Sequence, residues 1–130
     1  MVSETIRALT FDTGGTILDW HTGFSSILKK IGQRHGLEKD WPDIANQLRK
    51  RSLKKIINLG EFETPTINFD DAHALVLDDL CRENGLENFS SEERRKIAWE
   101  APHNFETWDD FPQILPRLKQ KYPVSYTHLR

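Results

Sequence analysis

The sequence predicts an α/β fold in which a block of helices is inserted after the first β-strand. A short apolar run at 6–11 has the composition of a buried strand, and helical periodicity follows it. A further helix and the start of a second strand come near the C-terminal end. This order is typical of an α/β core with an inserted helical module. We expect a first core strand and loop at 1–20, the helical module at 21–101, and a return to the core at 102–130.

The first strand is predicted over Ile6–Phe11, and it ends at Asp12. Thr13-Gly14-Gly15-Thr16 follows as a tight loop. Catalytic groups of open α/β sheets gather beyond the carboxyl ends of the strands, so Asp12 could act as a nucleophile or a metal ligand there. The alternative is a plain turn, in which Asp12 is a cap and the glycines supply positive φ.

Two helices are predicted next. The first is indicated by apolar residues at the i, i+3, i+4, i+7 spacing of one helical face, and it stops at Gly36. The second begins near Asp40, has Pro42 in its first turn and continues towards Gly60. The apolar face of the first helix comprises Phe24, Ile27, Leu28 and Ile31.

A third helix is predicted from about Asp70 to Gly85, with acidic residues in its first turn, where the helix dipole favours them. Ser90 and Glu93 have the spacing of a capping box, and they predict a short helix that ends before Pro102.

From Trp108 onwards another amphipathic helix is predicted, and Tyr122-Pro123 stops it. Val124–Tyr126 has the composition of the start of a second strand. The apolar face of this last helix comprises Phe111, Ile114, Leu115 and Leu118.

The composition argues against several classes of partner. With 18 Lys+Arg against 20 Asp+Glu, the chain has no broad basic field for nucleic acid or an anionic membrane. No span reaches the ~20 apolar residues of a membrane helix, and the N-terminus lacks the layout of a signal peptide. The single cysteine, Cys81, fits a reducing compartment and a place in the core. We therefore expect a cytoplasmic protein with no nucleic-acid or membrane partner.

The histidines lie on separate predicted elements and show no metal-ligand spacing. We expect them to be solvated or capping residues, and we expect no metal site and no cofactor. The tryptophans are expected mainly in packing, although Trp20 follows the loop closely enough to line a pocket. The five histidines are His21, His35, His73, His103 and His128.

The stretch Phe11–Trp20 resembles the first motif of the haloacid dehalogenase (HAD) superfamily, in which a strand ends in a nucleophilic aspartate followed by Gly-Thr. Asp-Thr-Gly-Gly-Thr also looks like the phosphate loop of actin-like ATPases, sugar kinases and hydantoinases. That loop should continue into a second strand, whereas a helical face follows here. The resemblance implies a Rossmann-like core with an inserted helical cap. It extends to proteins labelled type II haloacid dehalogenases through residues 48–53, 67–73, 102–108, 111–112 and 115–118.

The resemblance implies a nucleophilic role for Asp12, which would attack C2 of a 2-haloalkanoic acid, displace halide and form an ester that water hydrolyses. It implies that Thr16, the second candidate catalytic residue, supports the loop and its ligand. A cap arginine of the family holds the substrate carboxylate or the halide, and Arg49 is the nearest match, with Arg51 as the alternative. A solvated helix face is the competing interpretation for both arginines. The implied partner is a small acidic substrate, and a homodimer of the full-length parent stays open.

Two departures from the family pattern matter. Phosphatases of the superfamily carry a second aspartate where this chain has Gly14, which counts against phosphomonoester hydrolysis. Gly14 and Trp20 are instead expected near the substrate. Ser125, or Thr127, is the candidate for the hydroxyl that follows the second core strand, and the later lysine and acidic motifs are absent. We therefore expect a C-terminally truncated, inactive fragment whose residues after Pro123 need not be native. A non-catalytic helical fragment and an actin-like phosphate-binding protein are the alternatives.

Overall fold

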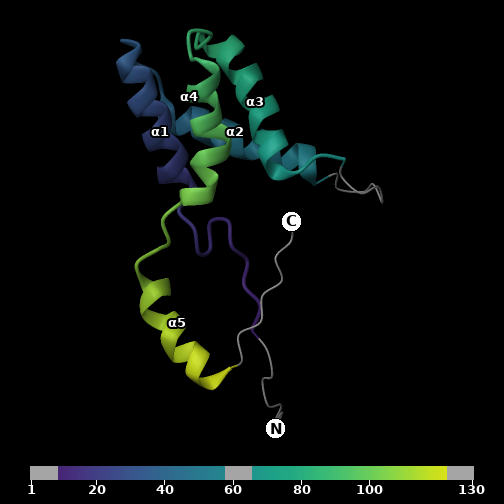
Figure 1. Ribbon diagram of the computed structural model, residues 1–130, viewed down its shortest axis with the longest axis vertical. Coiled ribbons are helices and arrows are strands. Elements are labelled where there is room, and N and C mark those ends of the chain that lie inside the picture. The colour runs from purple at the N-terminus through teal and green to yellow at the C-terminus, as the bar shows by residue number, and fades with distance from the viewer. Residues whose placement is uncertain (1–8, 58–65, 123–130) are drawn as a thin grey trace. The chain divides into compact units, whose positions relative to one another are not determined.

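The computed structural model describes residues 9–57 and 66–122 (Figure 1). The chain divides into two compact units. One unit is Trp20–Phe105, and the other combines Met1–Asp19 with Glu106–Arg130. No helix in the described ranges is both long and apolar enough to cross a membrane.

The first unit consists of helices packed around one apolar core. Its three long helices are α1 (Trp20–Arg34), α2 (Trp41–Ile56) and α3 (Phe69–Asn84). These helices confirm the three predicted from periodicity, and the predicted apolar face of α1 points inward. The largest fully buried side chains of the core include Phe24, Leu28, Ile31, Leu48, Leu77, Leu80, Leu86 and Ile97.

Local caps explain where these helices begin and end. The side chain of Asp40 accepts a hydrogen bond from the backbone N–H of Asp43 at 3.0 Å, so α2 starts where it was predicted. Asn68 and Asp71 form a capping box at the start of α3, slightly before the predicted start. Gly85 ends α3 with a φ of 68°, a left-handed conformation that glycine adopts without strain.

The short helix α4 (Ser91–Arg95) continues directly into a π-helical turn, η1 (Lys96–Glu100), and a 3₁₀ turn, η2 (Pro102–Asn104). The capping box predicted for Ser90 and Glu93 is confirmed. The widened turn η1 was not expected, because a wider turn leaves no signature in a pattern this short.

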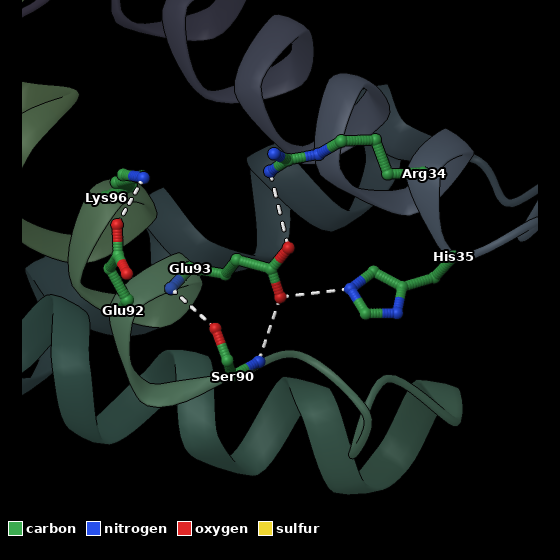
Figure 2. A network of polar contacts seen from close by, with 6 residues as sticks. All are labelled: Arg34, His35, Ser90, Glu92, Glu93 and Lys96. Atoms are coloured by element: carbon green, nitrogen blue, oxygen red, sulfur yellow. Dashed lines mark hydrogen bonds and ion pairs between the residues drawn. The ribbon is translucent and has the colours of Figure 1, made fainter.

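Glu93 belongs to a polar network that joins the start of α4 to the end of α1 (Figure 2). One carboxylate oxygen accepts from the backbone N–H of Ser90 at 2.9 Å and lies 2.9 Å from His35 Nε2. The other oxygen accepts from Arg34 at 3.3 Å. The hydrogen bond from Ser90, followed by that from His35, lowers the pKa of Glu93. This residue therefore caps one helix and holds a second.

His73 and Cys81 both lie in the core of this unit. Cys81 is fully buried, as expected, and burial raises its pKa to about 11. His73 is only 3% exposed, so the expectation of a solvated or capping histidine was wrong at this position. Its ring packs against Phe24 at 5.3 Å and Phe69 at 5.9 Å between ring centroids, which makes it part of an aromatic cluster.

The second unit contains helix α5 (Asp110–Lys121), which confirms the last predicted helix. The expected first strand is not formed in its described part, Leu9–Phe11, and residues 6–8 lie outside the described ranges. An isolated strand has no partner for its backbone N–H and C=O groups, and the described residues supply no neighbouring strand. The second predicted strand, from Val124, also lies outside those ranges. The Rossmann-like sheet therefore stays a prediction.

Candidate active site

The loop that follows Asp12 is a compact turn closed by its own backbone. The N–H groups of Ile17 and Leu18 both donate to the carbonyl of Thr13 at 3.0 Å, and the N–H of Gly15 donates to the carbonyl of Leu18 at 3.0 Å. Gly15 has a φ of 101°, which a residue with a Cβ rarely adopts. The loop turns back within a few residues and delivers the chain to α1.

The hydroxyl of Thr16 donates a hydrogen bond to Asp12 Oδ2 at 2.8 Å. The two residues that were predicted as the catalytic pair are therefore in direct contact. A carboxylate with one oxygen held by a hydroxyl has a defined orientation, which is what a nucleophilic carboxylate needs. Gly14 lies between them in sequence and offers no side chain to the space beside Asp12.

The returning segment of the chain pairs with this loop. Leu18 and Thr107 form an antiparallel bridge, and the N–H of Asp19 donates to the carbonyl of Glu106 at 2.9 Å. Trp108 makes two further contacts, because its backbone N–H donates to Ile17 and its indole N–H donates to Gly15, both at 2.9 Å. The sequence analysis did not single out Trp108 for this role.

Arg49, in the helical unit, is the predicted anion-binding arginine. Its guanidinium carbon lies 5.7 Å from the centroid of the Trp20 ring and 5.6 Å from that of Phe69. Aromatic faces attract a guanidinium cation, so both rings help to hold Arg49 in place. Trp20 and Arg49, two residues predicted to contact the substrate, thus lie together, and Phe69 joins them.

The alternative arginine has a different environment. Arg51 donates to Glu83 Oε1 at 2.8 Å and to Gln47 at 2.9 Å, and its pKa is raised by the hydrogen bond to Glu83. Arg51 therefore forms an ion pair with α3.

His73 contacts this group of residues through the ring of Phe69. Burial, followed by the positive charge of Arg49, lowers the pKa of His73 to about 4, while Asp70 opposes the shift. The imidazole is therefore neutral at neutral pH, and it adds no second positive charge beside Arg49.

The remaining predicted site residue, Ser125, lies outside the described residues, and so does Thr127. Asp12, Gly14 and Thr16 belong to one unit, and Trp20 and Arg49 belong to the other. Among the residues that the structure describes, no group of three or more His, Cys, Asp or Glu side chains could hold a metal ion. Sequence reasoning missed Phe69, His73 and Trp108 as neighbours of the candidate site residues. All three stand within segments that carry the family resemblance, 67–73 and 102–108, but the resemblance gave none of them a role at the site.

Among known proteins, the chain resembles a solved haloacid dehalogenase. It is similar to a crystal structure described as the defluorinating L-2-haloacid dehalogenase Rha0230, with a TM-score of 0.74 and 32% sequence identity over 90% of this chain. The chain spans 48% of the length of that protein. No family model matches the sequence, and no curated protein matches it. The structural match confirms the resemblance that the motif around Asp12 predicted.

Proposed function

We propose that this chain carries the nucleophile loop and the cap of a 2-haloacid dehalogenase-type hydrolase. Trp20–Phe105 would be the cap, and the unit that contains Asp12 would contribute to a Rossmann-like core. The observation that carries the proposal is the 32% identical match over 90% of the chain to an L-2-haloacid dehalogenase. Such a core would also include Ser125 as the hydroxyl that follows its second strand.

The reaction follows from the chemistry of Asp12. A carboxylate oxygen of Asp12 attacks C2 of a 2-haloalkanoic acid, and the carbon–halogen bond breaks with its electron pair leaving on the halide. Water then attacks the carbonyl carbon of the resulting ester, which releases a 2-hydroxy acid and a proton and restores Asp12. Halide is a weak base and leaves without a general acid. The presence of Gly14 is therefore compatible with this reaction, whereas a phosphatase would need an acid there.

One feature of the helical unit supports an acidic substrate. Arg49 can hold a carboxylate through two parallel hydrogen bonds, and the rings of Trp20 and Phe69 lie beside its guanidinium.

The experiment is to incubate the protein with 2-chloropropionate, follow chloride release, and search by mass spectrometry for an ester on the peptide that contains Asp12. Asp12→Asn should lower chloride release by roughly a thousandfold or more and abolish the ester. Asp109→Asn is the matched control, because it removes a carboxylate of the same unit that caps no helix through its side chain. Retained turnover in Asp12→Asn would remove Asp12 from its role.

A non-catalytic helical fragment is the second candidate function. The core of Trp20–Phe105 is built from residues of that unit alone, so the unit can fold without the rest of a catalytic centre. Under this alternative the folded protein forms no ester and releases no chloride. An actin-like phosphate loop is disfavoured, since α1 begins at Trp20, directly after the loop, where a paired strand would be needed.

A further inference from the structure

Trp108 donates hydrogen bonds to two carbonyl groups of the loop after Asp12 that accept none of the three backbone hydrogen bonds within the loop. The three backbone hydrogen bonds within the loop end on the carbonyl oxygens of Thr13 and Leu18. The carbonyls of Gly15 and Ile17 accept instead from Trp108, the first from the indole N–H and the second from the backbone N–H. A single residue thus makes two hydrogen bonds of 2.9 Å to one turn.

These two carbonyls lie on either side of Thr16 in the chain. The carbonyl carbon of Gly15 is bonded to the backbone nitrogen of Thr16. Ile17 is the residue directly after Thr16, and its carbonyl lies on the other side. Holding both restricts the backbone rotations that aim the Thr16 side chain. That side chain donates to Asp12 Oδ2 at 2.8 Å, so the contacts run from Trp108 through the loop to the carboxylate.

We propose that Trp108 is a positioning residue for Asp12, which acts through Gly15 and Thr16 to hold the carboxylate in one orientation. This inference rests on the proposed function only in taking Asp12 as the nucleophile. The indole is 44% exposed and lies outside the core cluster of the helical unit, so its ring is not needed for the packing of that core. Its specific contribution is the N–H group, which phenylalanine lacks.

The test is Trp108→Phe, which keeps one aromatic ring and the backbone N–H and removes the indole donor. The carboxyl carbon resonance of Asp12 is measured by NMR, together with amide hydrogen exchange at Ile17 and Leu18. Thr16→Val provides the resonance position of Asp12 without its hydroxyl partner. Trp99→Phe is the matched control, because Trp99 is also half-exposed, at 43%, and belongs to the helical unit.

We expect Trp108→Phe to move the Asp12 resonance towards its position in Thr16→Val and to speed loop amide exchange about fivefold to tenfold, as expected for the loss of one ordinary hydrogen bond. Helical circular dichroism should match that of Trp99→Phe. An unchanged Asp12 resonance, or loop exchange equal to that of the control, would overturn the inference. Neither readout requires turnover, so a failure of the dehalogenase proposal would show separately as the absence of chloride release and of the ester on Asp12.

Discussion

His73 links the stability of the helical unit to pH. The folded state holds a neutral, buried imidazole with a pKa of about 4, against an ordinary value of 6.5. The unfolded chain binds the proton more readily than the folded one. The contribution of neutral His73 to the free energy of unfolding is therefore greatest above about pH 6.5 and falls as the pH decreases towards 4. The shift corresponds to a loss on the order of 3 kcal/mol at the acid end.

We expect His73→Leu to weaken this pH dependence, because the variant has no buried imidazole to protonate. Urea unfolding at pH values between 7 and 4 measures the effect as the slope of stability against pH. His21→Gln is the control, since it removes a histidine that lies outside the buried core. If His73→Leu and the wild type lose the same stability over that range, another group carries the dependence.

The roles of individual residues were predictable where the residues that contact each other are close in sequence. Asp12 and Thr16 stand four positions apart in one motif, and their contact follows from a tight turn. The environment of His73 was not predictable in this way. Its burial depends on Phe24 from another helix, and no spacing within α3 records that contact.

Among the helices, Glu93 shows how one side chain can connect two elements. It completes the capping box of α4 and also accepts hydrogen bonds from Arg34 and His35 at the end of α1. Its side chain is 16% exposed, so these contacts are less screened than those of an ordinary surface pair. Glu92, the preceding residue, is 75% exposed and pairs with Lys96 within the same helical segment.

This contrast provides a matched pair of variants. Glu93→Gln should lower the free energy of unfolding by about 1–2 kcal/mol, because it weakens the cap and the link to α1 together. Glu92→Gln should cost no more than about 0.5 kcal/mol, the usual scale of an exposed pair one turn apart. Chemical denaturation of both variants measures the difference. Equal losses would show that the cap and the contact with α1 together add no more stability than an exposed pair does.

The existence of each helix was predictable, and some details of their ends and packing were not. Periodicity and caps such as Asp40 and Ser90 depend on residues that are close in sequence, so α1 to α4 could be predicted. The close approach of α1 to α2 could not be predicted from the sequence. A Cβ on Gly32 would lie 2.2 Å from the Trp41 ring, so glycine is needed there for packing rather than as a helix breaker.

For the molecule as a whole, the two units should differ in local stability. Trp20–Phe105 contains the buried core cluster, whereas α5 has no buried residue and carries Pro116 in its interior. Amides of α1 to α3 should therefore exchange slowly, through cooperative opening of their own unit, and those of α5 should exchange much faster. Hydrogen exchange resolved by residue measures this. A common opening free energy for α3 and α5 would contradict it.

The candidate site as a whole depends on contacts that are distant in sequence. The indole of Trp108 reaches a carbonyl 93 residues earlier, and Arg49 packs on rings from two other positions of the helical unit. Sequence motifs identified Asp12 and Arg49 because the family resemblance includes them. The segment 102–108 includes Trp108 but did not predict its donor role, which appears only when the returning chain is paired with the loop.

That pairing has a consequence for engineering. Asp19 and Glu106, which flank the helical unit on its two sides, are joined by a hydrogen bond of 2.9 Å, and the bridge between Leu18 and Thr107 continues the ladder. The two ends of Trp20–Phe105 are therefore about as far apart as two neighbouring strands of a sheet. Because its two ends lie close together, such a unit is suited to insertion at the tip of a hairpin in a host scaffold.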